Sequence, residues 1–156
     1  MPKRVVPLPC ACAVMRRATR AVTQYYDAAL KPAGFRATQY TILETLYRAG
    51  PSTQSRIARI LAIDNTTLSR SLKLMADAHW ISATAGKDRR QVVFRLTSKG
   101  KILLERAHPL WEQAQNELKS AFGASQWEHL FPLMDRMLAT IEDERVPSAR
   151  DSSSAP

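Results

Sequence analysis

Two short amphipathic segments, separated by only three residues, most strongly limit how this chain can fold. They cover residues 54–61 and 65–79, and the spacer is Ala62-Ile63-Asp64. A connection this short sets two helices at a steep angle. The carboxylate of Asp64 is placed to accept hydrogen bonds from the first-turn amides of the second helix, so it is predicted to cap that helix. The sequence therefore predicts a helix-turn-helix.

The second helix of this pair has a polar side that suits contact with base pairs. Leu68, Leu72 and Met75 recur at helical spacing and predict its buried stripe. Short hydrogen-bonding side chains, followed by Arg70, lie on the opposite side. Such residues near a helix N-terminus are typical of a helix that enters the major groove of DNA. They are also compatible with plain solvated surface, and this helix alone does not decide between the two.

After residue 79 the spacing of apolar residues changes from helical to alternating. Residues 80–84 and 91–96 predict two strands. The segment 85–90 between them has the glycine and polar content of a hairpin tip. A hairpin that follows a helix-turn-helix predicts a winged helix.

The hairpin concentrates positive charge that no core packing explains. Lys87, Arg89 and Arg90 lie in its tip and Arg95 lies in its second strand. A projection of this kind can place a guanidinium in the narrow, electronegative minor groove. Asp88 is interpreted as an intramolecular partner that orients one of the arginines. The alternative is a surface loop that carries charge without a function.

The remaining segments predict helices on either side of this winged lobe. Apolar residues recur at three- and four-residue steps within 10–31, 38–48, 98–122 and 125–145. Pro109 is expected to break or bend the third of these helices. The predicted fold is mostly α: a winged helix-turn-helix with N- and C-terminal dimerisation helices.

The chain is accordingly divided into one DNA-binding lobe, one dimerisation region and two tails. The winged helix-turn-helix lobe covers residues 37–100, and the helical dimerisation region covers 10–36 and 101–145. Residues 1–9 and 146–156 have too little apolar surface to offset the entropy of ordering, so they are predicted to be a flexible and a disordered tail.

The positive charge is concentrated in the first two thirds of the chain. Of a net charge of +9, residues 1–50 contribute +6, residues 51–106 contribute +7 and residues 107–156 contribute −4. This distribution favours a polyanionic partner, with an anionic membrane surface as a weaker alternative. No apolar run approaches the roughly 18–20 residues of a membrane span, and the N-terminus does not resemble a signal peptide. We therefore expect a cytoplasmic protein with no membrane partner.

The hairpin and the segment after it resemble the wing signature of the MarR-type regulators. The family's Asp-x-Arg and Leu-Thr-x-x-Gly patterns fall on Asp88, Arg90, Leu96, Thr97 and Gly100. Segments 38–40, 53–58 and 64–70 are also similar to the family, so the resemblance covers about residues 10–145. It implies an obligate homodimer, with the first helix and the last two forming the dimerisation region. It also implies a repressor that is relieved when a small molecule or an oxidant changes the spacing of the two recognition helices.

The residue pattern and the resemblance together predict which residues contact double-stranded DNA. They come from the start of the third helix, the first turns of the fourth helix and the hairpin tip. The predicted contacts are Thr53, Gln54, Ser55, Asn65, Thr66, Thr67, Ser69, Arg70, Lys73, Lys87, Asp88, Arg89 and Arg90.

The last helix favours a dimer independently of the resemblance. Its wide apolar stripe comprises Trp127, Leu130, Phe131, Met134, Leu138 and Ile141. The winged lobe has a core of its own, so the flanking helices need another surface to cover them, and a symmetric partner supplies one. The alternative is that they pack onto the lobe of the same chain. Two-fold symmetry would place two recognition helices about one DNA turn apart, so the operator is expected to be an inverted repeat.

The resemblance also implies a site for a small-molecule effector. In this family, effectors are often phenolic or other aromatic acids, bound where the dimerisation helices meet the DNA-binding lobe. The candidate lining residues are Arg16, Arg17, Tyr25, Tyr26, Tyr40 and His108. An arginine can pair with a carboxylate, although packing or simple exposure also explains each of these residues.

Cys12 suggests a different signal. Similarity to the organic-peroxide-sensing subgroup places Cys12 at the reactive-cysteine position and Tyr26 on one of its tyrosine partners. Arg16 and Ala37 stand where the other activating tyrosines would be. Arg16 lies one helical turn after Cys12 and would favour its thiolate. The alternative is a small buried apolar residue, as free cysteines usually are.

The sequence does not indicate an enzyme, a metal site or a cofactor. It holds no phosphate-binding loop and no nucleophile motif, and its three histidines are scattered. The rival class is an architectural DNA-binding protein with no effector and little sequence preference. The sequence thus predicts a dimeric, sequence-specific transcriptional regulator, a repressor released by a small aromatic or phenolic ligand, with a thiol-based repressor as the alternative.

Overall fold

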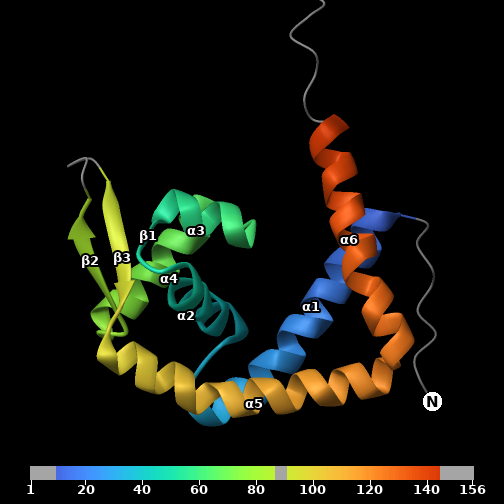
Figure 1. The fold of residues 1–156 in the computed structure, drawn as a ribbon, viewed down its shortest axis with the longest axis horizontal. Helices are drawn as coiled ribbons and strands as arrows, with labels where there is room; N and C mark the ends of the chain where they lie inside the picture. The colour runs from blue at the N-terminus through green and yellow to red at the C-terminus, as the bar shows by residue number, and fades with distance from the viewer. Residues whose placement is uncertain (1–9, 87–90, 145–156) are drawn as a thin grey trace, which may run out of the picture. The chain divides into compact units, whose positions relative to one another are not determined.

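The computed structural model describes residues 10–86 and 91–144, which form mainly helices and one small sheet (Figure 1). The elements are α1 (Ala11–Leu30), η1 (Lys31–Ala33), α2 (Ala37–Ala49), β1 (Ser52–Thr53), α3 (Gln54–Leu61), α4 (Asn65–Asp77), β2 (Ile81–Ala85), β3 (Val92–Leu96), α5 (Ser98–Phe122) and α6 (Ala124–Glu144). The chain divides after Ala114 into two compact units, residues 1–114 and 115–156. The predicted fold class is confirmed.

The helix-turn-helix is confirmed as α3 and α4, and polar caps fix the turn between them. The Thr53 hydroxyl accepts from the Arg56 N–H at 3.3 Å, and the Asp64 carboxylate accepts from the Thr67 N–H at 2.8 Å. Ala62 ends α3 in the left-handed region, with a φ of 49°. The orientation of α4 therefore depends on local hydrogen bonds as well as on packing.

The wing is an antiparallel sheet in the order β1-β3-β2. Ile81 pairs with Leu96 and Ala85 pairs with Val92, so the two long strands run in register up to the tip. The predicted strands are confirmed with shifts of one residue. The two-residue strand β1 was not predicted, because it forms only by pairing Ser52 with Phe94 and has no alternating pattern of its own.

A single core joins α2, α3 and α4 to the sheet and to the first half of α5. Its buried apolar side chains are Leu30, Phe35, Tyr40, Ile42, Leu43, Leu46, Ile57, Leu68, Leu72, Met75, Ile81, Phe94, Leu104 and Ala107. The predicted stripe of Leu68, Leu72 and Met75 is at most 1% exposed and is confirmed. The polar side of α4 is thereby turned outward.

The base of the wing is locked to the first turn of α5. The Thr97 hydroxyl lies 2.8 Å from the His79 carbonyl oxygen and 2.9 Å from that of Trp80, and it accepts from the Gly100 N–H at 3.0 Å. A Cβ at Gly100 would lie 2.1 Å from the Trp80 carbonyl oxygen, so only glycine fits here. This contact gives a physical reason for the Leu-Thr-x-x-Gly pattern.

Helix α5 is continuous through Pro109, so the break, one of the two predicted outcomes, does not occur. Proline removes one intrahelical hydrogen bond and crowds the preceding turn. Leu104 and Ala107, in the turns before the proline, are buried and anchor this part of the helix in the core. Tertiary packing thus outweighs the local cost of the proline.

The second compact unit contains the end of α5 and all of α6. Gly123, with a φ of 98°, closes α5 as predicted, and its N–H donates to the Lys119 carbonyl oxygen at 3.0 Å. The Trp127 ring packs edge to face with Phe122 and Phe131, with centroid distances of 6.4 and 5.3 Å. The rest of the predicted stripe on α6 is open to solvent in the single chain: Phe131 is 50%, Leu138 57% and Ile141 40% exposed. Among the described residues, no helix is both long and apolar enough to span a membrane.

Candidate nucleic-acid interface

The N-terminal ends of α3 and α4 form a polar hollow on the surface of the winged lobe. Thr53, Gln54, Ser55 and Asn65, all predicted to contact DNA, line this hollow of about 660 Å³. The Gln54 side-chain amide donates to the Asn65 backbone carbonyl at 3.0 Å and ties the two helix starts together. Gln54 therefore has a positioning role in addition to any contact with DNA.

The exposed side of α4 carries the other predicted contacts. All of them are exposed: the set is Asn65, Thr66, Thr67, Ser69, Arg70 and Lys73. Among them, Lys73 forms an ion pair with Asp77, with a distance of 2.7 Å between nitrogen and oxygen. Arg70 makes no such pair with any described carboxylate, so its guanidinium is available to a phosphate or a base edge.

The cap of α4 also sets the local charge. The hydrogen bonds from Thr67, side chain and backbone, lower the pKa of the Asp64 carboxyl below its ordinary value. Asp64 is therefore ionised at neutral pH and neutralises the positive end of the helix dipole. The exposed cation Arg70 lies further along the helix, away from this anionic cap.

Sequence reasoning missed two cations that line the same hollow, Arg56 and Arg59 of α3. Both are exposed and lie three residues apart, and Ile57 between them is fully buried. Their spacing on α3, away from its buried Ile57, was the signal that could have found them. They add positive charge beside Asn65, as expected of a surface that neutralises phosphates.

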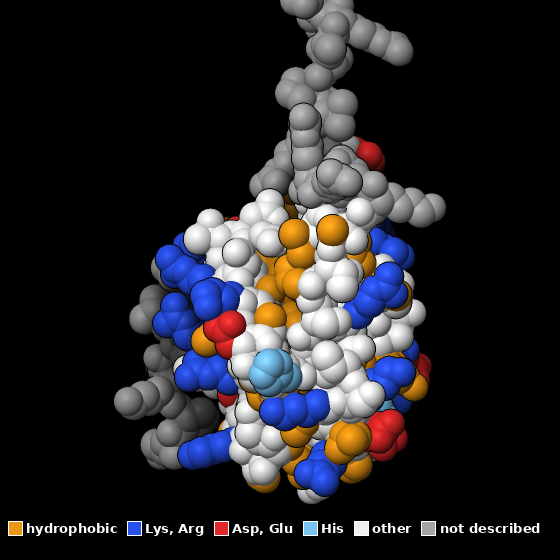
Figure 2. Space-filling view, turned by 90° about the vertical axis from the view of Figure 1, so that its left-hand side faces the viewer, with side chains coloured by type: hydrophobic (Ala, Val, Ile, Leu, Met, Phe, Trp, Pro, Cys, Tyr) orange, Lys and Arg blue, Asp and Glu red, His pale blue; other side chains and the backbone are white. Residues whose placement is uncertain are grey.

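The predicted wing contacts Lys87, Asp88, Arg89 and Arg90 lie outside the described residues. The strands on either side of them are described: the Gly86 N–H donates to the Gln91 carbonyl at 2.7 Å and closes the end of the ladder. Lys and Arg side chains flank a strip of hydrophobic side chains on the face in Figure 2. Strand β2 ends at Ala85 and strand β3 begins at Val92, on either side of the segment that carries the predicted cations.

The predicted effector residues do not meet in one cavity. Tyr40 of α2 and His108 of α5 are brought together, with the Tyr40 hydroxyl 3.0 Å from His108 Nδ1, and Trp111 stacks on both rings. Burial, with a contribution from nearby Glu44, raises the pKa of Tyr40 to about 12. The phenol therefore keeps its proton and can donate to an unprotonated Nδ1.

The other predicted effector residues lie on a different helix, α1. The rings of Tyr25 and Tyr26 meet edge to face at 5.6 Å, and the Tyr25 hydroxyl donates to the Ala114 carbonyl at 3.1 Å. Burial raises the pKa of Tyr26. The hydrogen bond joins α1 to α5 within the first unit, which is a structural role for Tyr25.

The first turns of α1 gather the two thiols and three arginines. Cys10 and Cys12 are exposed and unbridged, and they line a hollow of about 390 Å³ with Arg16, Arg17 and Arg20. The alternative of a buried Cys12 is therefore wrong for the single chain. In the described part of the chain, no three metal-ligating side chains cluster.

The fold and its polar surface define a winged helix DNA-binding protein. Residues 35–100 match the family model described as a winged helix DNA-binding domain. The chain is 34% identical to the transcriptional regulator MosR of M. tuberculosis, solved in complex with DNA, with coverage of 84% of this chain and 98% of that one and a TM-score of 0.72. The chain belongs to the MarR family of winged helix transcriptional regulators.

Two further solved structures, each below 25% identity, show the same fold alone. One is a mutant of E. coli MarR complexed with operator DNA, at 22% identity, 81% and 91% coverage of the two chains and a TM-score of 0.74. The other is Bordetella bronchiseptica BpsR, whose DNA binding is regulated by 6-hydroxynicotinic acid, at 21% identity, 80% and 96% coverage and a TM-score of 0.73. The relatives are transcriptional regulators and not enzymes.

Proposed function

We propose that this protein is a homodimeric repressor that binds an inverted-repeat operator and is released by a small aromatic acid. The observation that carries the proposal is the polar hollow at the starts of α3 and α4. Short hydrogen-bonding side chains line it together with the two cations Arg56 and Arg59. The exposed Arg70 lies on α4 of the same helix pair. Short polar groups beside cations match the mixture of base and phosphate contacts that DNA recognition needs.

The dimer is supported by the exposed apolar face of α6. Leu138 is 57% exposed and Phe131 is 50% exposed in the single chain, on a helix with a stripe of such residues. Contiguous apolar surface of this kind marks an interaction site, and a symmetric copy is the simplest cover. We assign dimerisation to residues 10–36 and 101–145, and DNA binding to residues 37–100.

Sequence-specific binding is tested by comparing the DNA upstream of the protein's own gene with a random duplex at one salt concentration. A specific regulator binds the upstream DNA at least about 1000-fold more tightly, as is usual for such proteins. Equal affinities, with a steep dependence on salt, would instead identify an architectural DNA-binding protein.

The residue assignment is tested on two cations of the same helix. Arg70→Ala is expected to weaken operator binding by about 1–3 kcal/mol. Lys73→Ala, which removes a cation already paired with Asp77, is expected to cost less.

Arg90→Ala should also cost about 1–3 kcal/mol while leaving the dimer intact. An Arg90 variant with unchanged affinity would remove the wing tip from the interface.

A thiol-based signal is the second candidate, favoured by the exposed Cys10 and Cys12 beside three arginines. Peroxides oxidise exposed cysteines more readily than buried ones. Cys12→Ser should abolish peroxide-triggered release of DNA, with Cys10→Ser as the matched control. Release by the Cys12 variant, or a wild type that ignores peroxide, would end this candidate.

A further inference from the structure

The start of α1 holds two thiol groups within one cationic hollow, here named the α1 hollow. Cys10 is the N-cap residue of α1 and Cys12 lies two residues later, and both are exposed and unbridged. They line a hollow of about 390 Å³ together with Arg16, Arg17 and Arg20. Thiolates are soft ligands, so a pair of them in one hollow suits a soft metal ion.

The number of ligands limits which ion the α1 hollow can hold. In the described part of the chain, no three histidine, cysteine or acidic side chains are placed to share one metal ion. Zinc sites in proteins use three or four protein ligands, so two thiols alone do not suit zinc. The soft monovalent ions Cu(I) and Ag(I) prefer sulfur ligands and are satisfied by two of them.

The charge of the occupied site also favours a monovalent ion. Binding forms two bonds from sulfur to the metal and releases the two thiol protons to solvent. Two thiolates and one monovalent ion leave the complex with a single negative charge. Arg16 and Arg20 follow Cys12 by four and eight residues, toward the same side of the helix, and attract this anion. The positive end of the helix dipole contributes in the same direction, since the first turn of α1 contains no acidic residue.

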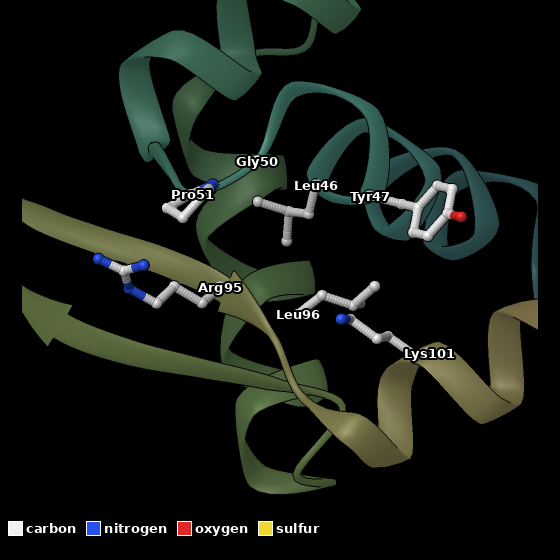
Figure 3. A pocket seen from close by; sticks show the side chains of 7 residues that line it. All are labelled: Leu46, Tyr47, Gly50, Pro51, Arg95, Leu96 and Lys101. Atoms are coloured by element: carbon white, nitrogen blue, oxygen red, sulfur yellow. The ribbon is translucent and has the colours of Figure 1, made fainter.

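Another hollow on the same compact unit shows that positive charge alone does not make such a site. It lies between the end of α2, strand β3 and the start of α5, and Arg95 and Lys101 line it (Figure 3). None of the described side chains around it offers a thiol, an imidazole or a carboxylate. It can attract an anion but cannot coordinate a metal ion, so it supplies a control variant.

We propose that the α1 hollow binds one soft monovalent metal ion, of the Cu(I) and Ag(I) class, between the Sγ atoms of Cys10 and Cys12. The arginines lie around the complex and offset its negative charge. Coordination transfers no electron and the ion keeps its charge, so this site differs from the oxidation of Cys12 by peroxide. The proposal goes beyond the proposed DNA-binding function and does not depend on it.

The test measures binding of Ag(I), supplied as silver nitrate in a chloride-free buffer, to the reduced full-length protein. Competitive calorimetry and native mass spectrometry should give one ion per chain, because both thiols bind the same ion. Two ions per chain would show two independent thiols and would overturn the proposal. Cys10→Ser and Cys12→Ser should each weaken binding at least about 100-fold, since each removes a direct ligand. Wild-type affinity in either variant also overturns the site.

The choice of a monovalent ion is tested by charge variants and by a second metal. Arg16→Gln combined with Arg20→Gln should weaken Ag(I) binding about fivefold, whereas Lys101→Gln, in the other cationic hollow, should leave it unchanged. Zn(II) should bind at least about 100-fold more weakly than Ag(I). Equal affinity for the two metals, or an arginine variant that binds like wild type, contradicts the assignment. These measurements contain no DNA, so a failure of the proposed function leaves their result unaffected.

Discussion

The winged lobe has a buried apolar core, whereas no described residue of helix α6 is buried. In the lobe, Leu68, Leu72 and Met75 are at most 1% exposed, and no described buried side-chain polar atom lacks a partner. On α6, the apolar residues Leu138 and Ile141 remain 57% and 40% exposed. Exposed apolar surface on this scale costs free energy in water. The comparison teaches that the lobe carries a core of its own, even with Ile60 and Leu74 exposed at its surface, whereas α6 has none.

The sharpest test of the lobe's completeness is Gly100→Ala. A methyl group placed 2.1 Å from the Trp80 carbonyl oxygen forces the wing base and α5 apart. We expect a loss of about 3 kcal/mol or more in the free energy of unfolding, measured by denaturant titration. Gly34→Ala is the control, because it meets no atom within 4 Å and should cost only about 1 kcal/mol for its φ of 76°. Equal losses in both variants would contradict the close contact.

The need of α6 for a partner is tested by Leu138→Asp. If a second copy covers Leu138, the charge should raise the dimer dissociation constant at least about tenfold, or about 1.4 kcal/mol, as measured by sedimentation. The unfolding of the lobe should not change. Ala139→Asp, an exposed neighbour outside the stripe, serves as the matched control. A Leu138 variant that dimerises like wild type would assign another role to the exposed face.

The Thr97 hydroxyl offers a smaller test on the lobe. Thr97→Val keeps the shape of the side chain but removes the hydrogen bonds to the His79 and Trp80 carbonyls and the acceptor for the Gly100 N–H. We expect a loss of about 1 kcal/mol in thermal or denaturant unfolding. Thr84→Val, at an exposed site on β2, should change stability by less than about 0.5 kcal/mol.

The smallest effect concerns the pH dependence of the α4 cap. The pKa of Asp64 is lowered in the folded state by its hydrogen bonds with Thr67. A lowered pKa stabilises the fold above the unfolded value of about 3.9 and loses this contribution as the pH falls through the folded value. The stability difference between wild type and Asp64→Asn should therefore shrink below about pH 4. A difference that is constant with pH would contradict the role of the ionised cap, and Asp77→Asn provides the control.

The sequence predicted the parts of the lobe whose signals are local. The stripe of Leu68, Leu72 and Met75, the Asp64 cap and the alternating strands each follow from neighbours in the chain, and all are present. Strand β1 could not be predicted in this way, because it exists only by pairing with β3. The sequence left open whether α5 breaks or bends at Pro109, because tertiary packing decides whether the helix continues there.

The site was predicted less completely than the fold. The polar residues of α3 and α4 follow from helical spacing, and the same spacing could have identified Arg56 and Arg59, but only the fold shows that they line one hollow with Asn65. The hollow between the end of α2, strand β3 and the start of α5 brings Leu46 close to Lys101, which lies more than fifty residues later. Tyr40 and His108 were both named as candidates, but nothing in the sequence shows that they contact each other.

The contact between Gly100 and Trp80 leaves the wing and the helix after it without a flexible joint. With the Thr97 side chain hydrogen-bonded to two carbonyls and no space for even one methyl group, the base of the hairpin and the start of α5 must turn together. A tilt of α5 therefore also changes the orientation of the hairpin formed by β2 and β3.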